Sequence, residues 1–210
     1  MHAVATRGNT GIVRRARSGD DLCPSVGPFW YRICVDTLAI SVRRATPDDA
    51  ISLAELVNDA YRVEKFFVDG DRTNAAELVE MMASGVFLVL EEAQGLAAAV
   101  YLERTDAAIY FGMLSVRADL RGLGLGTRLV RIAEAMGEAL GARECTLKIV
   151  NLREELGRWY KSLGYRDAGT SPYVAHRPVK QPCHFIEMYK PLASGSGAVL
   201  DSPMVAAGAA

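Results

Sequence analysis

Residues Met113–Thr127 read MLSVRADLRGLGLGT, and this stretch decides how the chain around it is organised. Apolar residues end a predicted strand, a turn with three glycines follows, and a helix-forming run begins directly after it. Glycine lets the backbone approach an anion closely, and the first N–H groups of a helix point outward with a partial positive charge. The stretch therefore predicts a strand–turn–helix unit that can hold a phosphate.

Two well-known phosphate loops match this turn poorly. A Walker loop needs Lys followed by Ser or Thr after its glycines, whereas Thr127-Arg128 follows here. A Rossmann fingerprint has its third glycine one residue later, and the acid that should end the next strand instead begins it, at Glu144. A tight turn without any ligand explains the glycines alone equally well. The turn by itself therefore predicts an anion site without naming the anion.

The chain on both sides of the turn alternates between strand and helix patterns. Predicted strands cover 38–43, 86–91, 97–102, 107–116, 145–150 and 184–189. Predicted helices begin near Thr46 and Asn74, after the glycine turn and after Asn151, each with apolar residues at helical spacing. The order β-α-α-β-β-β-α-β-α-β predicts a mixed α/β sheet with helices on both sides.

The composition limits the classes of protein and partner. The chain has 210 residues, 50% of them hydrophobic, and a net charge of −1, which is typical of one globular domain and gives no indication of a nucleic-acid partner. No apolar run approaches the ~20 residues that cross a bilayer, so we expect no membrane association. Four scattered cysteines and three dispersed histidines argue against a metal site.

The sequence divides into three parts. Residues 1–36 are interpreted as a disordered or presequence-like extension, 37–192 as one domain, and 193–210 as a flexible tail rich in Gly, Ala and Ser. The scattered cysteines fit a reducing compartment, so we expect a cytoplasmic protein. Import into mitochondria is the alternative, because the N-terminal part contains several arginines and no acid before Asp20.

A second motif follows the next predicted strand. Asn151 ends that strand, and the following helix carries Tyr160-Lys161-Ser162-Leu163-Gly164-Tyr165. Together, R-G-x-G-x-G after one strand and N-x(8)-Y-x-x-x-G-Y after the next closely resemble the GNAT superfamily of N-acetyltransferases, over roughly 40–192. The resemblance implies the GNAT α/β (α+β) fold: a central mixed, mostly antiparallel sheet of six to seven strands, about four flanking helices, and a splayed strand pair that receives the cofactor.

The resemblance also implies acetyl-CoA as cosubstrate, with its arm in the gap between 107–116 and 145–150. The implied cofactor-binding residues are Leu114, Ser115, Val116, Arg121, Gly122, Leu123, Gly124, Leu125, Gly126, Thr127 and Asn151. Tyr160 is the implied general acid, which protonates the leaving thiolate. A purely structural role is the alternative for Tyr160, because it shares a helical face with Leu156 and Leu163.

The acceptor side is less defined. Many relatives carry a glutamate on the strand before the glycine turn, where this chain has Tyr110-Phe111-Gly112. Glu64, Glu91 and Glu103 are candidate bases, although the sequence favours a solvated surface charge for each, and water is the alternative. The connection 61–72 is aromatic and carries both signs of charge. We expect substrate contacts from Tyr61, Glu64, Phe67 and Tyr110. A loop held by a hydrophobic anchor, without substrate contacts, is an equally good interpretation of 61–72.

These expectations lead to an N-acetyltransferase that acts on a primary amine, by direct attack on acetyl-CoA, with a small-molecule acceptor. A catalytically inactive acetyl-CoA-binding sensor or partner domain is one alternative, and a protein or peptide acetyltransferase is another. A nicotinamide-dependent oxidoreductase is a third, disfavoured by the glycine spacing. GNAT relatives are often dimers, so a homodimer is compatible with the resemblance.

Overall fold

The computed structural model describes residues 33–35, 38–105, 107–174 and 177–193. The strands are β1 (Ile33–Val35), β2 (Leu38–Arg44), β3 (Val86–Glu92), β4 (Gly95–Arg104), β5 (Ala108–Val116), β6 (Glu144–Val150), β7 (Arg166–Pro172) and β8 (His184–Pro191). The helices are α1 (Ala50–Ala60), α2 (Ala75–Ser84), α3 (Leu125–Ala139) and α4 (Glu154–Ser162). Three 3₁₀ turns join them: η1 (Pro47–Asp49), η2 (Tyr61–Phe66) and η3 (Ala118–Leu120).

The strands form one mixed sheet in the order β1-β2-β3-β4-β5-β6-β8-β7. Every neighbouring pair is antiparallel except β5 and β6, which are parallel. The predicted fold class is therefore confirmed, including the four helices and the mostly antiparallel sheet. None of the helices in the described ranges is long and apolar enough to cross a membrane.

Two strands were absent from the sequence prediction. Strand β1 has three residues and lies inside 1–36; the rest of that predicted extension lies outside the described residues, as does all but Ala193 of the predicted tail. Strand β7 is an edge strand that pairs only with β8, and nearly all its residues are exposed. A strand without a buried face shows no alternation of apolar and polar residues, which is the signal that sequence reasoning uses.

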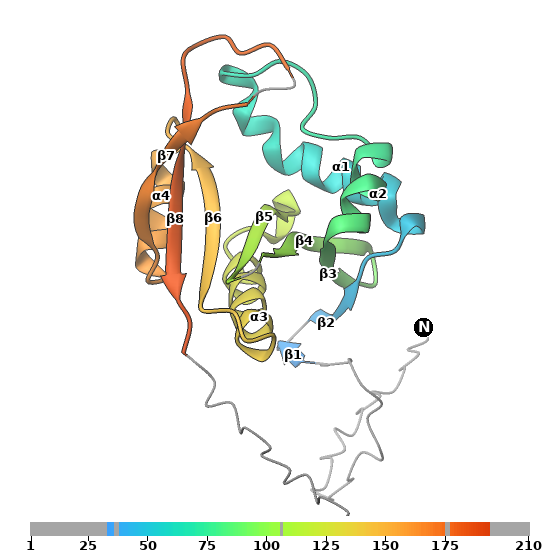
Figure 1. The fold of residues 1–210 in the computed structure, drawn as a ribbon. Helices are drawn as coiled ribbons and strands as arrows, with labels where there is room; N and C mark the ends of the chain where they lie inside the picture. The colour runs from blue at the N-terminus through green and yellow to red at the C-terminus, as the bar shows by residue number, and fades with distance from the viewer. Residues whose placement is uncertain (1–32, 36–37, 106, 175–176, 194–210) are drawn as a thin grey trace, which may run out of the picture.

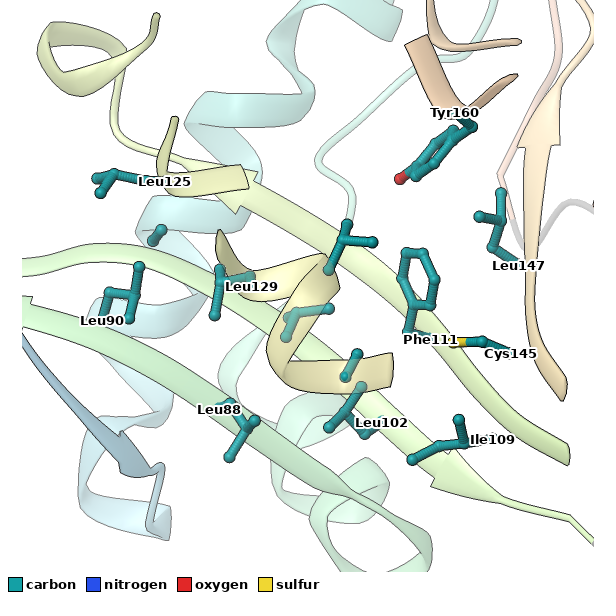
Figure 2. Close-up of a cluster of buried hydrophobic side chains, with 14 of the residues drawn as sticks. Leu88, Leu90, Leu102, Ile109, Phe111, Leu125, Leu129, Cys145, Leu147 and Tyr160 are labelled. Atoms are coloured by element: carbon teal, nitrogen blue, oxygen red, sulfur yellow. The ribbon is translucent and has the colours of Figure 1, made fainter. Parts of the chain in front are cut away.

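Helices cover both faces of the sheet, and each face has its own core (Figure 1). Residues of β3 alternate between the two: Leu88 and Leu90 join the cluster under α3 and α4, while Phe87 and Val89 join the cluster under α1 and α2. Figure 2 shows the first cluster, with Leu129 of α3 inside it. The alternation follows from the two-residue period of a strand.

The helix starts follow the predicted capping chemistry. The side chain of Asn74 accepts a hydrogen bond from the backbone N–H of Glu77 at 3.0 Å, which fixes the first turn of α2. Ahead of α1, the Asp49 carboxylate accepts from the backbone N–H of Thr46 at 2.7 Å and from Arg43 on β2. These contacts attach the α1–α2 layer to the sheet edge and so set the position of the connection that follows α1.

Candidate active site

Strands β5 and β6 pair over only three residues before they separate. Their register runs from Ala108 opposite Glu144 to Tyr110 opposite Thr146, although β5 continues to Val116 and β6 to Val150. In Figure 1 the two ribbons diverge away from the end that they share. Beyond Tyr110, the main-chain groups of β5 that face β6 therefore have no partner strand.

A β-bulge lies in this unpaired part of β5. Ser115 is opposite Ala99 on β4 and Gly112 is opposite Tyr101, so β5 has one residue more than β4 between these pairs. Met113 in the bulge has φ +50°, which is uncommon for a residue with a side chain. The bulge redirects the strand beside the gap, and Leu114 lines the space between the separated strands.

The glycine turn after β5 leads into α3, and no described side chain caps the N-terminus of this helix. Gly122 and Gly124 have φ values of +81° and +80°, and a Cβ atom at either position would meet nothing within 4 Å. The first hydrogen bond of α3 runs from the N–H of Arg128 to the carbonyl of Gly124. Among the described residues, the N–H groups of 125–127 have no acceptor, so three donors and the helix dipole face open space.

Three cavities form a continuous passage from this turn. The turn cavity, of about 500 Å³, lies against the helix start, and the throat, of about 110 Å³, lies between the separated strands. The lateral cavity, of about 560 Å³, lies between η2, α2 and the segment after β7. Leu114, Arg153 and Trp159 line both the turn cavity and the throat. Tyr61, Glu64 and Arg72 line both the throat and the lateral cavity.

Most of the expected cofactor-binding residues meet at the turn cavity. Its lining includes Leu114, Val116, Arg121, Gly122, Gly124, Leu125, Gly126 and Thr127. Ser115 and Leu123 are not in this lining: the Ser115 hydroxyl is buried and donates to the carbonyl of Met113, and the Leu123 side chain is 58% exposed. Asn151 lines none of the three cavities; its Oδ1 accepts from the N–H of His184 at 2.8 Å.

Tyr160 on α4 lies in the throat. Its ring packs against Phe111, Trp159 and Tyr165, with centroid distances of 5.9, 4.6 and 5.7 Å. Figure 2 shows its hydroxyl directed toward β5, and no hydrogen-bond partner for it is found within the described residues. Burial raises the pKa of Tyr160 far above its ordinary value, so the hydroxyl keeps its proton. The ring is part of the core while the hydroxyl faces the cavity.

Glu64 is buried, and the expectation of a solvated surface charge is wrong for this residue. It is 4% exposed because η2 continues from α1 and turns it toward the throat. One carboxylate oxygen accepts from Arg153 Nη1 at 3.3 Å, while the other is buried without a partner in the described part of the chain. Burial raises the pKa of Glu64, and the charges of Arg72 and Arg153 oppose that rise.

The other two candidate bases lie away from the passage. Glu91 forms an ion pair with Arg43 at 2.7 Å, and Glu103 accepts a hydrogen bond from the Tyr101 hydroxyl at 3.2 Å. Neither residue lines the throat or the lateral cavity. The structure therefore brings only Glu64 of the three to the site.

Two of the expected substrate contacts are placed elsewhere. Phe67 is fully buried, packs edge-on against Phe66 and Tyr173, and lines none of the three cavities, so it anchors the connection. Tyr110 lines a separate cavity beside β6. Tyr61 does line the passage, and burial raises its pKa to about 12.

Three residues of the passage were not among the expected site residues. Trp159 lies one position before the motif tyrosine, and its ring comes within 3.7 Å of where a Cβ on Gly126 would stand. Arg153, at the start of α4, contacts Glu64 across 89 residues of chain. Met113 forms the bulge. Contacts between segments far apart in the sequence bring these side chains to the site, and a local sequence pattern does not predict such contacts.

Comparisons with known proteins agree with this architecture. Residues 83–167 match the family model described as the acetyltransferase (GNAT) domain. An N-acetyltransferase from Staphylococcus aureus Mu50 superposes with a TM-score of 0.61 at 16% identity, covering 73% of this chain and 99% of that one. The ribosomal-protein-S18-alanine N-acetyltransferase from Escherichia coli gives 0.58 at 16%, covering 75% and 97%. No curated protein matches the chain.

A further solved structure, of yncA from Salmonella typhimurium with its cofactor acetyl-CoA, has a TM-score of 0.59 at 16% identity, and the match covers 75% of this chain and 96% of that one. Identities this low establish the fold alone. The family model places a GNAT acetyltransferase domain at residues 83–167, and GNAT acetyltransferases use acetyl-CoA.

Proposed function

We propose that this protein transfers the acetyl group of acetyl-CoA to the primary amine of a small molecule. The observation that carries the proposal is the continuous passage from the uncapped start of α3, through the throat with Tyr160, to the lateral cavity. Two separate substrates can reach one point from its two ends. A direct transfer reaction needs this arrangement, because the reacting atoms must meet while both substrates are bound.

The residues present fit acetyl-CoA. Three free N–H groups at 125–127, together with Arg121, match a pyrophosphate, and no side chain at Gly122 or Gly124 blocks it. The unpaired edge of β5 offers N–H and carbonyl groups to the amides of the coenzyme's arm. In this proposal Ser115 and Leu123 contribute main-chain groups, and Asn151 serves by joining the ends of β6 and β8.

Acetyl-CoA supplies an activated thioester, and the chain supplies proton transfer and charge stabilisation. Glu64 takes the proton from the acceptor amine; its burial raises its pKa toward the range of an effective base. The amine nitrogen then bonds to the carbonyl carbon as the carbon–sulfur bond breaks. Unpaired N–H groups of β5 stabilise the negative charge on the carbonyl oxygen, an effect worth about 3 kcal/mol per donor. Tyr160 donates its proton to the sulfur, and the second proton that the nitrogen loses as the amide forms replaces it.

The shape of the lateral cavity favours a small acceptor over a protein. The segment before β8 crosses above the connection after η2: Val179 bridges Val68, and the N–H of Lys180 donates to the carbonyl of Phe67 at 2.8 Å. The cavity beside this crossing measures about 560 Å³, within the usual range for small-molecule sites. An extended peptide would need a more open groove.

Two measurements test the proposal. Calorimetric titration with acetyl-CoA should give saturable binding to one site, and release of free thiol should then depend on an added amine from a panel of polyamines, aminoglycosides, amino acids and peptides. Binding without thiol release from any amine would favour the sensor alternative. Absence of binding at millimolar acetyl-CoA, with stabilisation by NAD instead, would overturn the proposal.

A further inference from the structure

The lateral cavity contains an arginine that makes no direct ion pair with any described residue. Arg72 is the last residue of the connection 61–72, and it lines both the throat and the lateral cavity. Among the described residues it forms no salt bridge, and its Nε is buried without a hydrogen-bond partner. Glu64 attracts this cation but bonds directly to Arg153, so one carboxylate stands against two guanidinium groups. A cation paired this incompletely costs free energy, and such an arrangement is typical of a position where a ligand provides the missing charge.

The other charged residues of the cavity are largely balanced in pairs. Lys65 lies 3.4 Å from Asp71, and Arg177 lies 3.6 Å from Glu77. Glu80 is exposed at the rim, where water screens its charge. The inner wall therefore presents two groups with unused bonding capacity: the guanidinium of Arg72 and the second carboxylate oxygen of Glu64.

The aromatic surroundings hold Arg72 in one orientation. Its guanidinium carbon lies 5.1 Å from the ring centroid of Tyr61, within the range of a cation–π contact. Tyr173 lines the same cavity; burial raises its pKa and the nearby charge of Arg72 opposes that rise, so the two side chains lie close together. A planar guanidinium fixed in this way is prepared for the two-point hydrogen bonding that a carboxylate or similar oxyanion accepts.

We propose that the acceptor is a small amine that also carries an oxyanion close to the amine, of which an amino acid is the simplest example, and that Arg72 binds this oxyanion. The inference rests on the proposed transfer reaction, in which Glu64 receives the amine's proton. Arg72 and Glu64 are near enough for their charges to interact, and both border the throat. An amine at Glu64 and an oxyanion at Arg72 would satisfy both groups at once.

The substrate side of the test needs no mutation. Methionine, phenylalanine, glutamate and lysine are each compared with their α-amide and their decarboxylated amine, both in thiol release and in calorimetric binding to the protein with CoA. Phosphonate analogues of the same amino acids distinguish a carboxylate-specific site from a general oxyanion site. At least one acid should have kcat/KM at least tenfold above its amide. If every amide and amine equals or exceeds its acid, the inference is overturned while the proposed transfer stands.

Variants provide the second arm. For the acid that the wild type prefers, Arg72→Gln should raise KM about tenfold to a hundredfold and remove the preference over the amide, and Arg72→Lys should restore part of it. Arg62→Gln is the matched control, because Arg62 belongs to the same connection and its side chain is 72% exposed. Thermal melts verify folding. If Arg72→Gln keeps the wild-type preference for the acid over the amide, the role of Arg72 is overturned. Acetyl-CoA binding by the same variant is measured alongside, and unaltered binding shows that the proposed function itself has not failed.

Discussion

Replacing Tyr160 with Phe removes one oxygen atom from the throat and leaves the aromatic ring in place. The ring keeps its contacts with Phe111, Trp159 and Tyr165, and the hydroxyl has no partner within the described residues to lose. The free energy of unfolding should therefore change by less than about 1 kcal/mol. Acetyl-CoA affinity should also stay near that of the wild type, because the proposed pyrophosphate site is at the turn cavity, away from this hydroxyl.

The expected loss is in the chemical step. A positioned general acid contributes roughly 10²–10⁴-fold, so Tyr160→Phe should lower kcat at least a hundredfold, which corresponds to about 2.7 kcal/mol of transition-state free energy. Thiol release at saturating amine measures kcat, and calorimetry measures coenzyme binding. Since the pKa of Tyr160 is raised far above neutrality, the wild type should show no loss of activity from its ionisation up to pH 9 or so.

Tyr165→Phe is the matched control for this experiment. Tyr165 belongs to the same aromatic group, but its hydroxyl donates to Glu134 at 3.0 Å and lines none of the three cavities. This variant should lose about 1–2 kcal/mol of stability and keep its kcat. A kcat for Tyr160→Phe within threefold of the wild type, or an equal loss in both variants, would refute the reasoning.

Three further predictions concern the turn, the base and the sheet edge. Gly124→Ala meets no steric obstacle but must hold φ +80°, so it should cost about 1–2 kcal/mol in a urea titration and weaken acetyl-CoA binding in calorimetry. Folding raises the pKa of Glu64 above 4.5, so the native state retains a proton that the unfolded chain has lost, and the free energy of unfolding falls as pH rises through that window. Glu64→Gln should abolish this pH dependence in a series of urea titrations. The same variant should remove the acidic limb from the pH profile of kcat/KM. Hydrogen bonds from Arg43 lower the pKa of Asp49 to about 2, so Asp49→Asn should lower the free energy of unfolding at neutral pH. The difference from the wild type should shrink as pH falls from 3.8 toward 2. A difference that stays unchanged at low pH would contradict the lowered pKa of Asp49.

The sequence predicted the elements whose residues have a periodic or capping pattern. The apolar strand at 86–91, the cap at Asn74 and the glycine turn before α3 are all local features, and the structure has each where it was expected. Strand β7 escaped prediction because its exposed residues carry no such pattern. The order of strands then follows from the helices that separate them and from the family resemblance.

The interior of the site was harder to predict, because it depends on contacts between distant segments. Glu64 lies among charged residues in the sequence and was expected at the surface, yet Arg153 meets it in the interior. Phe67 belongs to an aromatic connection that was expected to contact substrate, but its side chain packs into the core. Burial, rather than residue type, decides between a surface, a substrate-binding and a core role. The burial of these side chains cannot be predicted locally, because it depends on how the connection after α1 packs against the segment before β8.

The narrow throat also has a consequence for the order in which substrates bind. The coenzyme's phosphates and the acceptor would occupy cavities of about 500 and 560 Å³ on either side of a constriction of about 110 Å³. Neither substrate has to leave before the other arrives, and no side chain needs to store the acetyl group between two half-reactions. Double-reciprocal plots of initial rate at several fixed coenzyme concentrations should therefore intersect, whereas a protein that passed the acetyl group through a covalent intermediate would give parallel lines.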